Sequence, residues 1–195
     1  EEKYITGDAS DKEKFLAFAK CLGKAVGHPI FHWAHLELKK YFGYDGVLNE
    51  NTAEEVYDIC NKVLQAPDMG ARKLIKMSDV TLICTTDDPV DTLEWHDMIK
   101  NDETFDVKVL PAWRPDKAKN IIKPEFASYI NQLSEVSGVK IDSFKALKEA
   151  LKVRHDYFEQ KGCNVADFAL EYVMYKPVSD EKIEEIFAKK MNGGE

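Results

Sequence analysis

The stretch Val80–Asp88, VTLICTTDD, places a run of apolar, β-favouring residues directly before two threonines and two aspartates. Pro89 follows and begins the amphipathic run PVDTLEWHDMIK, which predicts a helix over 89–100. A second apolar run, FDVKVLPAW at 105–113, predicts another buried strand. Strand, helix and strand in that order form the unit from which parallel sheets are built, so this region is predicted to be α/β.

The residues before about Met77 predict helices and no strand. The run HPIFHWAHLELKKYFG at 28–43 has Pro29 near its start and Gly43 at its end, as expected for a helix start and a helix stop. Two capping-box patterns mark further helix starts: Ser10 with Glu13, and Thr52 with Glu55. We therefore predict two parts, an all-helical region at 1–77 and an α/β region at 78–195.

The end of the chain carries weaker signals of the same kind. Helices are predicted at about 124–134 and 143–160, and a last helix is predicted to begin near Ser179. Between them, VADFALEYVMY at 165–175 is a candidate for a third strand.

Composition excludes several classes of function. The 195 residues carry a net charge of −8 without a basic cluster interleaved with aromatics, which argues against a nucleic-acid partner. No apolar run approaches the roughly 18 residues of a membrane helix, and the polar start EEKYITGDAS has no signal-peptide pattern. Four dispersed cysteines favour reduced thiols in the cytoplasm. Because the chain begins with Glu, we expect it to be a piece of a longer protein.

Both predicted strands end in residues that can carry chemistry. One ends in Asp87 and Asp88, and the other in Trp113, Arg114 and Asp116. In parallel α/β architectures, ligands bind beyond the carboxyl ends of the strands. An arginine there can grip a carboxylate with two hydrogen bonds, and a tryptophan can cover a sugar face and exclude water.

Each of these residues also has a structural interpretation, which the sequence leaves open. Asp88 before a proline is an ordinary helix N-cap, and Asp116 can cap the following turn in the same way. Arg114 can belong to a structural ion pair. Spacing alone names no reaction.

Three histidines, His28, His32 and His35, recur at i, i+4 and i+7. Three imidazoles on one helix face could bind zinc, but Pro29 at the first helical position leaves His28 outside the helix as a cap. The alternatives are that His32 and His35 hydrogen-bond within an aromatic cluster, or that one reaches a substrate. The two remaining histidines are expected at surface or boundary positions of amphipathic helices: His96 and His155.

Several of these stretches together resemble the uronate (glucuronate) isomerases of the amidohydrolase superfamily. The matching stretches follow the family order: EEKYITGDAS, HWAHLELKKYFG, LNENTAEEVYD, CTTDDPVDTLEWH, VLPAWRPDKAKNI and GCNVADFAL. CTTDDP followed about two dozen residues later by RPDKA is the most specific part.

The resemblance implies a partial (β/α)8 TIM barrel, like those of metal-dependent hydrolases, with a largely α-helical insertion. It implies an aldose–ketose isomerase that converts D-glucuronate to D-fructuronate and D-galacturonate to D-tagaturonate in the cytoplasm. The implied cofactor is a divalent metal, zinc being the expected one, with its ligands outside this segment. The segment alone is therefore expected to be inactive. The implied partner is a small uronic acid, and a homo-oligomer is an open alternative.

The resemblance also implies roles for single residues. Arg114 matches the arginine of the RPD motif, a ligand of substrate oxygens, and Asp167 matches the aspartate of the SDH motif, a candidate for proton transfer. Trp113, Asp87 and Asp88 belong to the matching strand ends and are expected to bind substrate. The helical motif HWxHLEL contributes a pocket wall: His32 and His35.

Two positions depart from the family pattern. Phe168 stands where SDH has its histidine, and Asn164 stands where the family often has arginine. These departures favour one alternative, a diverged superfamily relative that acts on another sugar acid. The α-rich first third favours a second alternative, a non-catalytic helical binding module, which would expose an apolar groove between helices.

Overall fold

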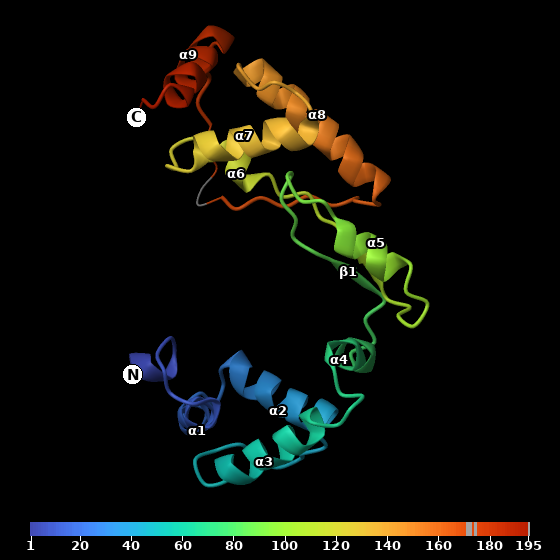
Figure 1. The fold of residues 1–195 in the computed structure, drawn as a ribbon. Helices are drawn as coiled ribbons and strands as arrows, with labels where there is room; N and C mark the ends of the chain where they lie inside the picture. Colours follow the sequence, from blue (N-terminus) through green and yellow to red (C-terminus); the bar gives the residue numbers. More distant parts are fainter. Residues whose placement is uncertain (171–172, 174, 195) are drawn as a thin grey trace. The chain divides into compact units, whose positions relative to one another are not determined.

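The computed structural model describes residues 1–170, 173 and 175–194. The chain divides into two compact units, Glu1–Val80 and Thr81–Glu195 (Figure 1). Each unit has a hydrophobic core of its own. The described part of the first unit is helical, as predicted. Its elements are a short 3-10 helix and four α-helices: η1 (Glu2–Tyr4), α1 (Asp11–Leu22), α2 (Pro29–Phe42), α3 (Ala53–Leu64) and α4 (Ala71–Met77).

The helix ends of the first unit follow local chemistry. The capping box at the start of α1 is confirmed, because Ser10 and Glu13 bond reciprocally across the first turn. Gly43 ends α2 in the left-handed conformation, with φ at 68°. The capping box predicted at Thr52 was wrong. The Thr52 hydroxyl donates to the Val47 carbonyl and accepts from the Asn49 amide instead, which ties down the loop before α3.

The core of the first unit lies among α1, α2 and α3. The packing follows from apolar residues at helical spacing, which give each helix one side to bury. The buried members are Ala19, Leu22, Leu38, Leu48, Ala53 and Val56.

The second unit contains the predicted strand–helix–strand segment. Its elements in chain order are β1 (Leu82–Cys84), α5 (Glu94–Lys100), β2 (Lys108–Leu110), α6 (Asp116–Lys119), α7 (Phe126–Ser137), α8 (Phe144–Gln160) and α9 (Asp180–Met191). The strands pair in parallel, with Ile83 opposite Val109, so the predicted parallel pair is confirmed. None of the helices formed by the described residues has the length and apolar character to cross a membrane.

Two predicted boundaries in this unit were wrong. The helix predicted over 89–100 begins only at Glu94, because the preceding residues turn and Leu93 takes a left-handed φ of 57°. The strand predicted at 165–175 is limited, among its described residues, to one parallel bridge between Ala166 and Trp113. Residues 171, 172 and 174 of that prediction lie outside the described residues.

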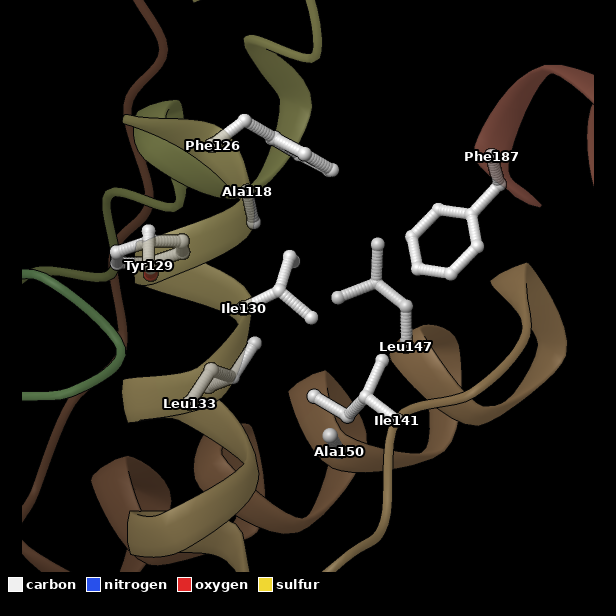
Figure 2. Close-up of a cluster of buried hydrophobic side chains, with 9 residues drawn as sticks. All are labelled: Ala118, Phe126, Tyr129, Ile130, Leu133, Ile141, Leu147, Ala150 and Phe187. Atoms are coloured by element: carbon white, nitrogen blue, oxygen red, sulfur yellow. The ribbon is translucent and has the colours of Figure 1, made fainter. Parts of the chain in front are cut away.

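The main core of the second unit joins α7, α8 and α9. Figure 2 shows Phe126 and Ile130 of α7 converging with Leu147 of α8 toward Phe187 of α9. The rings of Phe126 and Phe187 meet edge to face, with centroids 6.2 Å apart. Tyr129 lies on the opposite flank of α7 (Figure 2), where its hydroxyl reaches the end of the first strand segment. This core therefore supports the strand ends from behind.

Candidate active site at the strand ends

Three chain segments meet beyond the carboxyl ends of the strands. Asp87 forms a parallel bridge with Trp113, and Trp113 forms another with Ala166. The amide of Arg114 donates to the carbonyl of Asp87 at 3.0 Å, and the amide of Asp167 donates to the carbonyl of Trp113 at 3.2 Å. The segments finishing in TTDD and AWRPD thus lie side by side and parallel, as expected.

The bridges divide the site residues between two faces. Side chains alternate along extended backbone, so the bridged residues Asp87 and Trp113 share one face, and Arg114 and Asp167 lie on the other. Trp113 is only 7% exposed, and its ring packs edge to face against His155 and Phe158 of α8. The helix-covered face therefore holds Trp113, and the opposite face carries the arginine.

Arg114 stands between two carboxylates on the opposite face. Its Nη2 lies 3.2 Å from Oδ2 of Asp167, and its Nε lies 3.1 Å from Oδ2 of Asp116. The Nε is buried, yet its N–H does not aim at an acceptor among the described residues. The Arg114 side chain is 34% exposed and that of Asp167 is 54% exposed. The Arg114–Asp167 ion pair is therefore open to solvent, whereas Nε is enclosed beside Asp116.

Asp116 is held by a second cation. Lys119 Nζ lies 2.7 Å from Asp116 and also donates to the Ala169 carbonyl. Burial by itself raises the pKa of the Asp116 carboxyl. The bond from Lys119, the Ala169 amide and the charge of Arg114 outweigh that effect and hold the pKa below its ordinary value. Asp116 is therefore an ionised anchor. It joins Arg114, the 167–169 segment and α6.

Asp87 is engaged by protein donors. Its Oδ2 accepts from the Thr85 hydroxyl at 2.6 Å and from the Ala112 amide at 3.1 Å. The same hydroxyl lies 2.7 Å from Nε2 of His96 on α5. His96 has the expected boundary position, since it is partly buried and its side chain is 11% exposed. The Asp87 carboxylate ties the end of one strand to the next.

Asp88 is also engaged, but by another set of groups. It does not cap α5; its Oδ1 accepts from the Val90 amide and from the Tyr129 hydroxyl at 2.8 Å. Burial, followed by the bond to Asp88, raises the pKa of Tyr129 above its ordinary value. Lys117 Nζ lies 3.4 Å from the other Asp88 oxygen. These contacts fix the turn that follows the first strand segment.

Arg154, which the sequence analysis did not single out, holds the same turn from α8. It is 8% exposed, and it donates from Nε to the Pro89 carbonyl at 2.7 Å and from Nη2 to the Asp91 carbonyl at 2.8 Å. The guanidinium also lies 4.2 Å from the centre of the Tyr157 ring. An amphipathic helix pattern does not predict this contact, because the contact forms only when α8 packs across the turn in the folded protein.

The two candidate histidines belong to the first unit. His35 bonds at both ring nitrogens, with Nδ1 2.6 Å from the Phe31 carbonyl and Nε2 accepting from the Leu48 amide at 2.9 Å. His32 is exposed, and its ring centroid lies 6.0 Å from that of Phe31. A role for either histidine in substrate binding stays a prediction.

The donor groups of the strand ends do not fit a metal ion by themselves. Across residues 1–170, 173 and 175–194, no group of three or more His, Cys, Asp or Glu side chains is arranged to hold one. The carboxylates of Asp87, Asp88 and Asp116 already accept bonds from protein donors.

A family model described as glucuronate isomerase matches residues 1–195. The chain belongs to this family. It is 62% identical over 193 residues to a uronate isomerase of Lachnospira eligens, covering 99% of this chain and 41% of that protein. A uronate isomerase of Lachnoclostridium phytofermentans is 60% identical, with 100% and 42% covered. The chain thus spans about two fifths of the length of the curated relatives it matches.

Solved structures of the family agree with the fold. The crystal structure of uronate isomerase from Thermotoga maritima matches with a TM-score of 0.90 and 36% identity, covering 99% of this chain and 42% of that one. Glucuronate isomerase from Caulobacter crescentus matches with a TM-score of 0.84 at 23% identity, covering 95% and 39%, which shows likeness of fold alone.

Phe168, which stands where the family's SDH motif has its histidine, lies beside a lysine in the structure. The ring is 51% exposed at the strand ends, and Lys119 Nζ lies 5.1 Å from its centroid. Lys119 is thus a further charged member of the site. Its only sequence signal was the i, i+3 spacing from Asp116 in α6.

Proposed function

We propose that the full-length protein is a cytoplasmic uronate isomerase that interconverts D-glucuronate with D-fructuronate and D-galacturonate with D-tagaturonate. In this proposal the parallel strands are part of a (β/α)8 barrel, and the divalent metal, expected to be zinc, is held by residues outside the segment. The contact that carries the proposal is the 3.2 Å pair of Arg114 and Asp167 at adjacent strand ends. The family membership over the whole chain supports it.

The reaction requires a proton to move between two carbons. A base removes the C2 proton of the aldose, the electron pair forms a C1–C2 double bond, and negative charge develops on the C1 oxygen. The proton of the C2 hydroxyl then moves to the C1 oxygen. The C2 carbonyl forms as carbon C1 takes up the proton that the base removed from C2, which gives the ketose. A carboxylate positioned at these carbons can carry the proton, and a fixed cation can stabilise the oxyanion.

Arg114 and Asp167 suit these two roles. The exposed part of the Arg114 side chain can donate to a substrate oxygen, either of the uronate carboxylate or of the developing oxyanion. Asp167 is the more exposed partner of the pair, so its carboxylate is free to meet a substrate carbon or hydroxyl. Asp116 and Lys119 neutralise each other beside them, which leaves the Arg114–Asp167 pair to respond to the substrate.

Asp87, Asp88 and Trp113 have a supporting role in this proposal. Their side chains meet protein groups: Thr85 at Asp87, Tyr129 at Asp88, and α8 at Trp113. These contacts favour positioning of the strand ends over direct substrate binding.

Kinetics of full-length variants test the proposal. Arg114→Met is expected to lower kcat/KM for glucuronate by about 100-fold or more, and Arg114→Lys is expected to restore only part, since an ammonium lacks the planar fork. Asp167→Asn is expected to lower kcat by about 100-fold, because the amide cannot carry the proton.

A surface ion pair provides the matched control for these variants. Lys140 and Asp142 also lie 3.2 Å apart, with side chains 88% and 62% exposed, and they are not part of the strand ends. Lys140→Met and Asp142→Asn should therefore leave both kinetic constants unchanged. Near wild-type turnover in Arg114→Met and Asp167→Asn would defeat the assignment.

Phe168 favours a second candidate, an isomerase of a different sugar acid. An apolar ring at the strand ends accepts a less polar substrate edge than a histidine does. A panel of uronates and neutral aldoses, assayed with the wild type and with Phe168→His, separates the two. A shift toward glucuronate in the variant supports the second candidate, and an unchanged preference for glucuronate supports the first.

The helical binding module has one structural feature in its favour. The first unit contains an apolar groove of about 340 Å³ between its helices, lined by aromatic residues that include Phe15, Phe18 and Trp33. The family match covers this unit together with the second. It therefore supports the isomerase over a separate binding module.

A further inference from the structure

The hydroxyl of Thr85 lies between a histidine and a carboxylate. Its oxygen is 2.7 Å from His96 Nε2, 2.6 Å from Asp87 Oδ2 and 3.2 Å from the carbonyl of Leu110. The three side chains come from the end of the first strand segment and from α5. They lie on the helix-covered face, behind the face that carries Arg114.

The number of available protons determines which group donates each of these hydrogen bonds. A threonine hydroxyl has one hydrogen, and the shortest, charge-assisted bond takes it to Asp87. The remaining contact then requires His96 to donate from Nε2. Nδ1 of His96 is buried and without a partner among the described residues, which is less costly for a bare lone pair than for an N–H. The neutral Nε2–H form of His96 therefore fits both the contact of Nε2 with Thr85 and the unpartnered Nδ1.

The Asp87 carboxylate passes this constraint on to the second strand. Its Oδ2 also accepts the amide of Ala112, and the carbonyl of Asp87 accepts the amide of Arg114. Loss of the Thr85 bond would leave the carboxylate free to rotate away from the Ala112 amide. The backbone pairing that places Arg114 would then loosen.

We propose that His96 is a positioning residue, which acts through Thr85 to fix the Asp87 carboxylate and thereby the register that places Arg114. The catalytic consequence rests on the proposed isomerase function, whereas the structural one does not. His96 touches no part of the open face, so it is assigned no contact with substrate.

Two substitutions at Thr85 in the full-length protein test the central link. Thr85→Val keeps the shape but removes the hydroxyl, and kcat/KM for glucuronate is expected to fall by about 10- to 100-fold, mostly in kcat. Thr85→Ser keeps the hydroxyl and should recover activity to within about 3-fold of the wild type. Thr81→Val, an exposed threonine at the start of the same segment, is the matched control and should behave as wild type. Equal losses in Thr85→Val and Thr85→Ser would overturn the proposal.

Substitutions at His96 test whether it acts through Thr85. His96→Gln can present an amide N–H near the position of Nε2 and should retain more activity than His96→Leu. The double variant Thr85→Val/His96→Leu should be no worse than Thr85→Val alone, since both remove one chain of bonds. Additive losses, or equal effects of Gln and Leu, would contradict the proposal.

Two measurements on the wild type and on Thr85→Val do not depend on activity. Nitrogen-15 shifts of histidine in the wild type should identify His96 as the neutral Nε2–H form. Hydrogen exchange at the amides of Ala112 and Arg114 should be faster in Thr85→Val and unchanged in Thr81→Val. An Nδ1–H tautomer, or unchanged exchange, would defeat the proposal even if the protein isomerised glucuronate. Faster exchange in a protein inactive on every uronate would support it and refute the proposed function alone.

Discussion

At the residue scale, the carboxylates of the strand ends differ in what they bind. Asp87 and Asp88 each accept bonds from a buried or half-buried hydroxyl and from a backbone amide. The Asp167 side chain pairs with Arg114, and more than half of its surface is exposed. Asp87 and Asp88 are already hydrogen-bonded to protein donors, so they hold the backbone. Asp167 is exposed, so it can meet a substrate.

Asp116 gives a pH-dependent prediction at this scale. Its pKa in the folded protein is held below the ordinary value of 3.8. Its contribution to stability is therefore full above that value and is lost as the pH falls through the lower, folded pKa. Asp116→Asn should show a shallower fall of unfolding free energy below about pH 5 than the wild type, measured by urea denaturation across the acid range.

An exposed carboxylate provides the control for this effect. Asp142→Asn removes a charge from a side chain that is 62% exposed and paired only at the surface. If Asp116→Asn and Asp142→Asn gave the same acid profile, the bonds from Lys119 and Ala169 would contribute nothing to the ionised state of Asp116.

Arg114 and Asp167 could be predicted from the sequence, whereas His96 and Lys119 could not. Arg114 stands in the RPD motif at the end of an apolar run, and Asp167 was indicated only by its match to the aspartate of the SDH motif. His96 lies in an amphipathic helix whose pattern is satisfied by a surface histidine, and its contact with Thr85 depends on how α5 packs on β2. Lys119 follows Asp116 at a common helical spacing, and its contact with Phe168 joins segments about fifty residues apart.

At the scale of elements, local signals predicted helix existence better than helix starts. The sequence PVDTLEW has a proline at a suitable first position, yet α5 begins only at Glu94. Tertiary bonds decide the difference, since Arg154 takes the carbonyls of Pro89 and Asp91 that helical hydrogen bonds would otherwise use. The strands are short for a related reason: regular pairing gives way to single bridges where side chains take over amide partners.

Arg154 gives the prediction at this scale. Arg154→Met would leave two carbonyls without their donor, and the free energy of unfolding is expected to fall by about 2–4 kcal/mol. Arg154→Lys should recover only part of it, because a single ammonium cannot span both carbonyls. Urea denaturation of each variant measures the loss.

A lysine on the exposed side of the same helix provides the control for Arg154. Lys152 pairs with Asp156 at the surface, so Lys152→Met should change the unfolding curve very little. A loss in Arg154→Met no larger than in Lys152→Met would mean that α8 does not stabilise the turn through this side chain.

At the scale of the whole molecule, the change of hydrophobic period after Met77 and the division at Val80 have one cause. Each unit buries a separate set of apolar side chains, one from α1–α3 and one from α7–α9. Period and capping could therefore predict two parts. A closed barrel could not be predicted from these residues alone. The chain spans about two fifths of the length of its relatives, and its described residues form one parallel strand pair with further single bridges.

The small sheet leads to a prediction for the 195-residue chain produced alone. Among the described residues β1 pairs with β2 alone, and Leu82 is 47% exposed. Parallel strands are normally covered on both faces, and an open strand edge is a template for pairing with another chain. The isolated chain is therefore expected to self-associate, with a mass that rises with concentration in light scattering, while the full-length protein gives one fixed mass.

The isolated chain is expected to form the Arg114–Asp167 ion pair without catalysing the reaction. Arg114 and Asp167 are held by contacts within the second unit, so their ion pair can form in the isolated chain. The curated relatives are more than twice as long, and in the proposed function the groups that complete the site around a uronate lie outside this segment. The isolated chain is thus expected to show no turnover of glucuronate under conditions in which the full-length protein is active. A monomeric isolated chain that isomerised glucuronate would overturn both expectations, because it would place a complete site within these 195 residues.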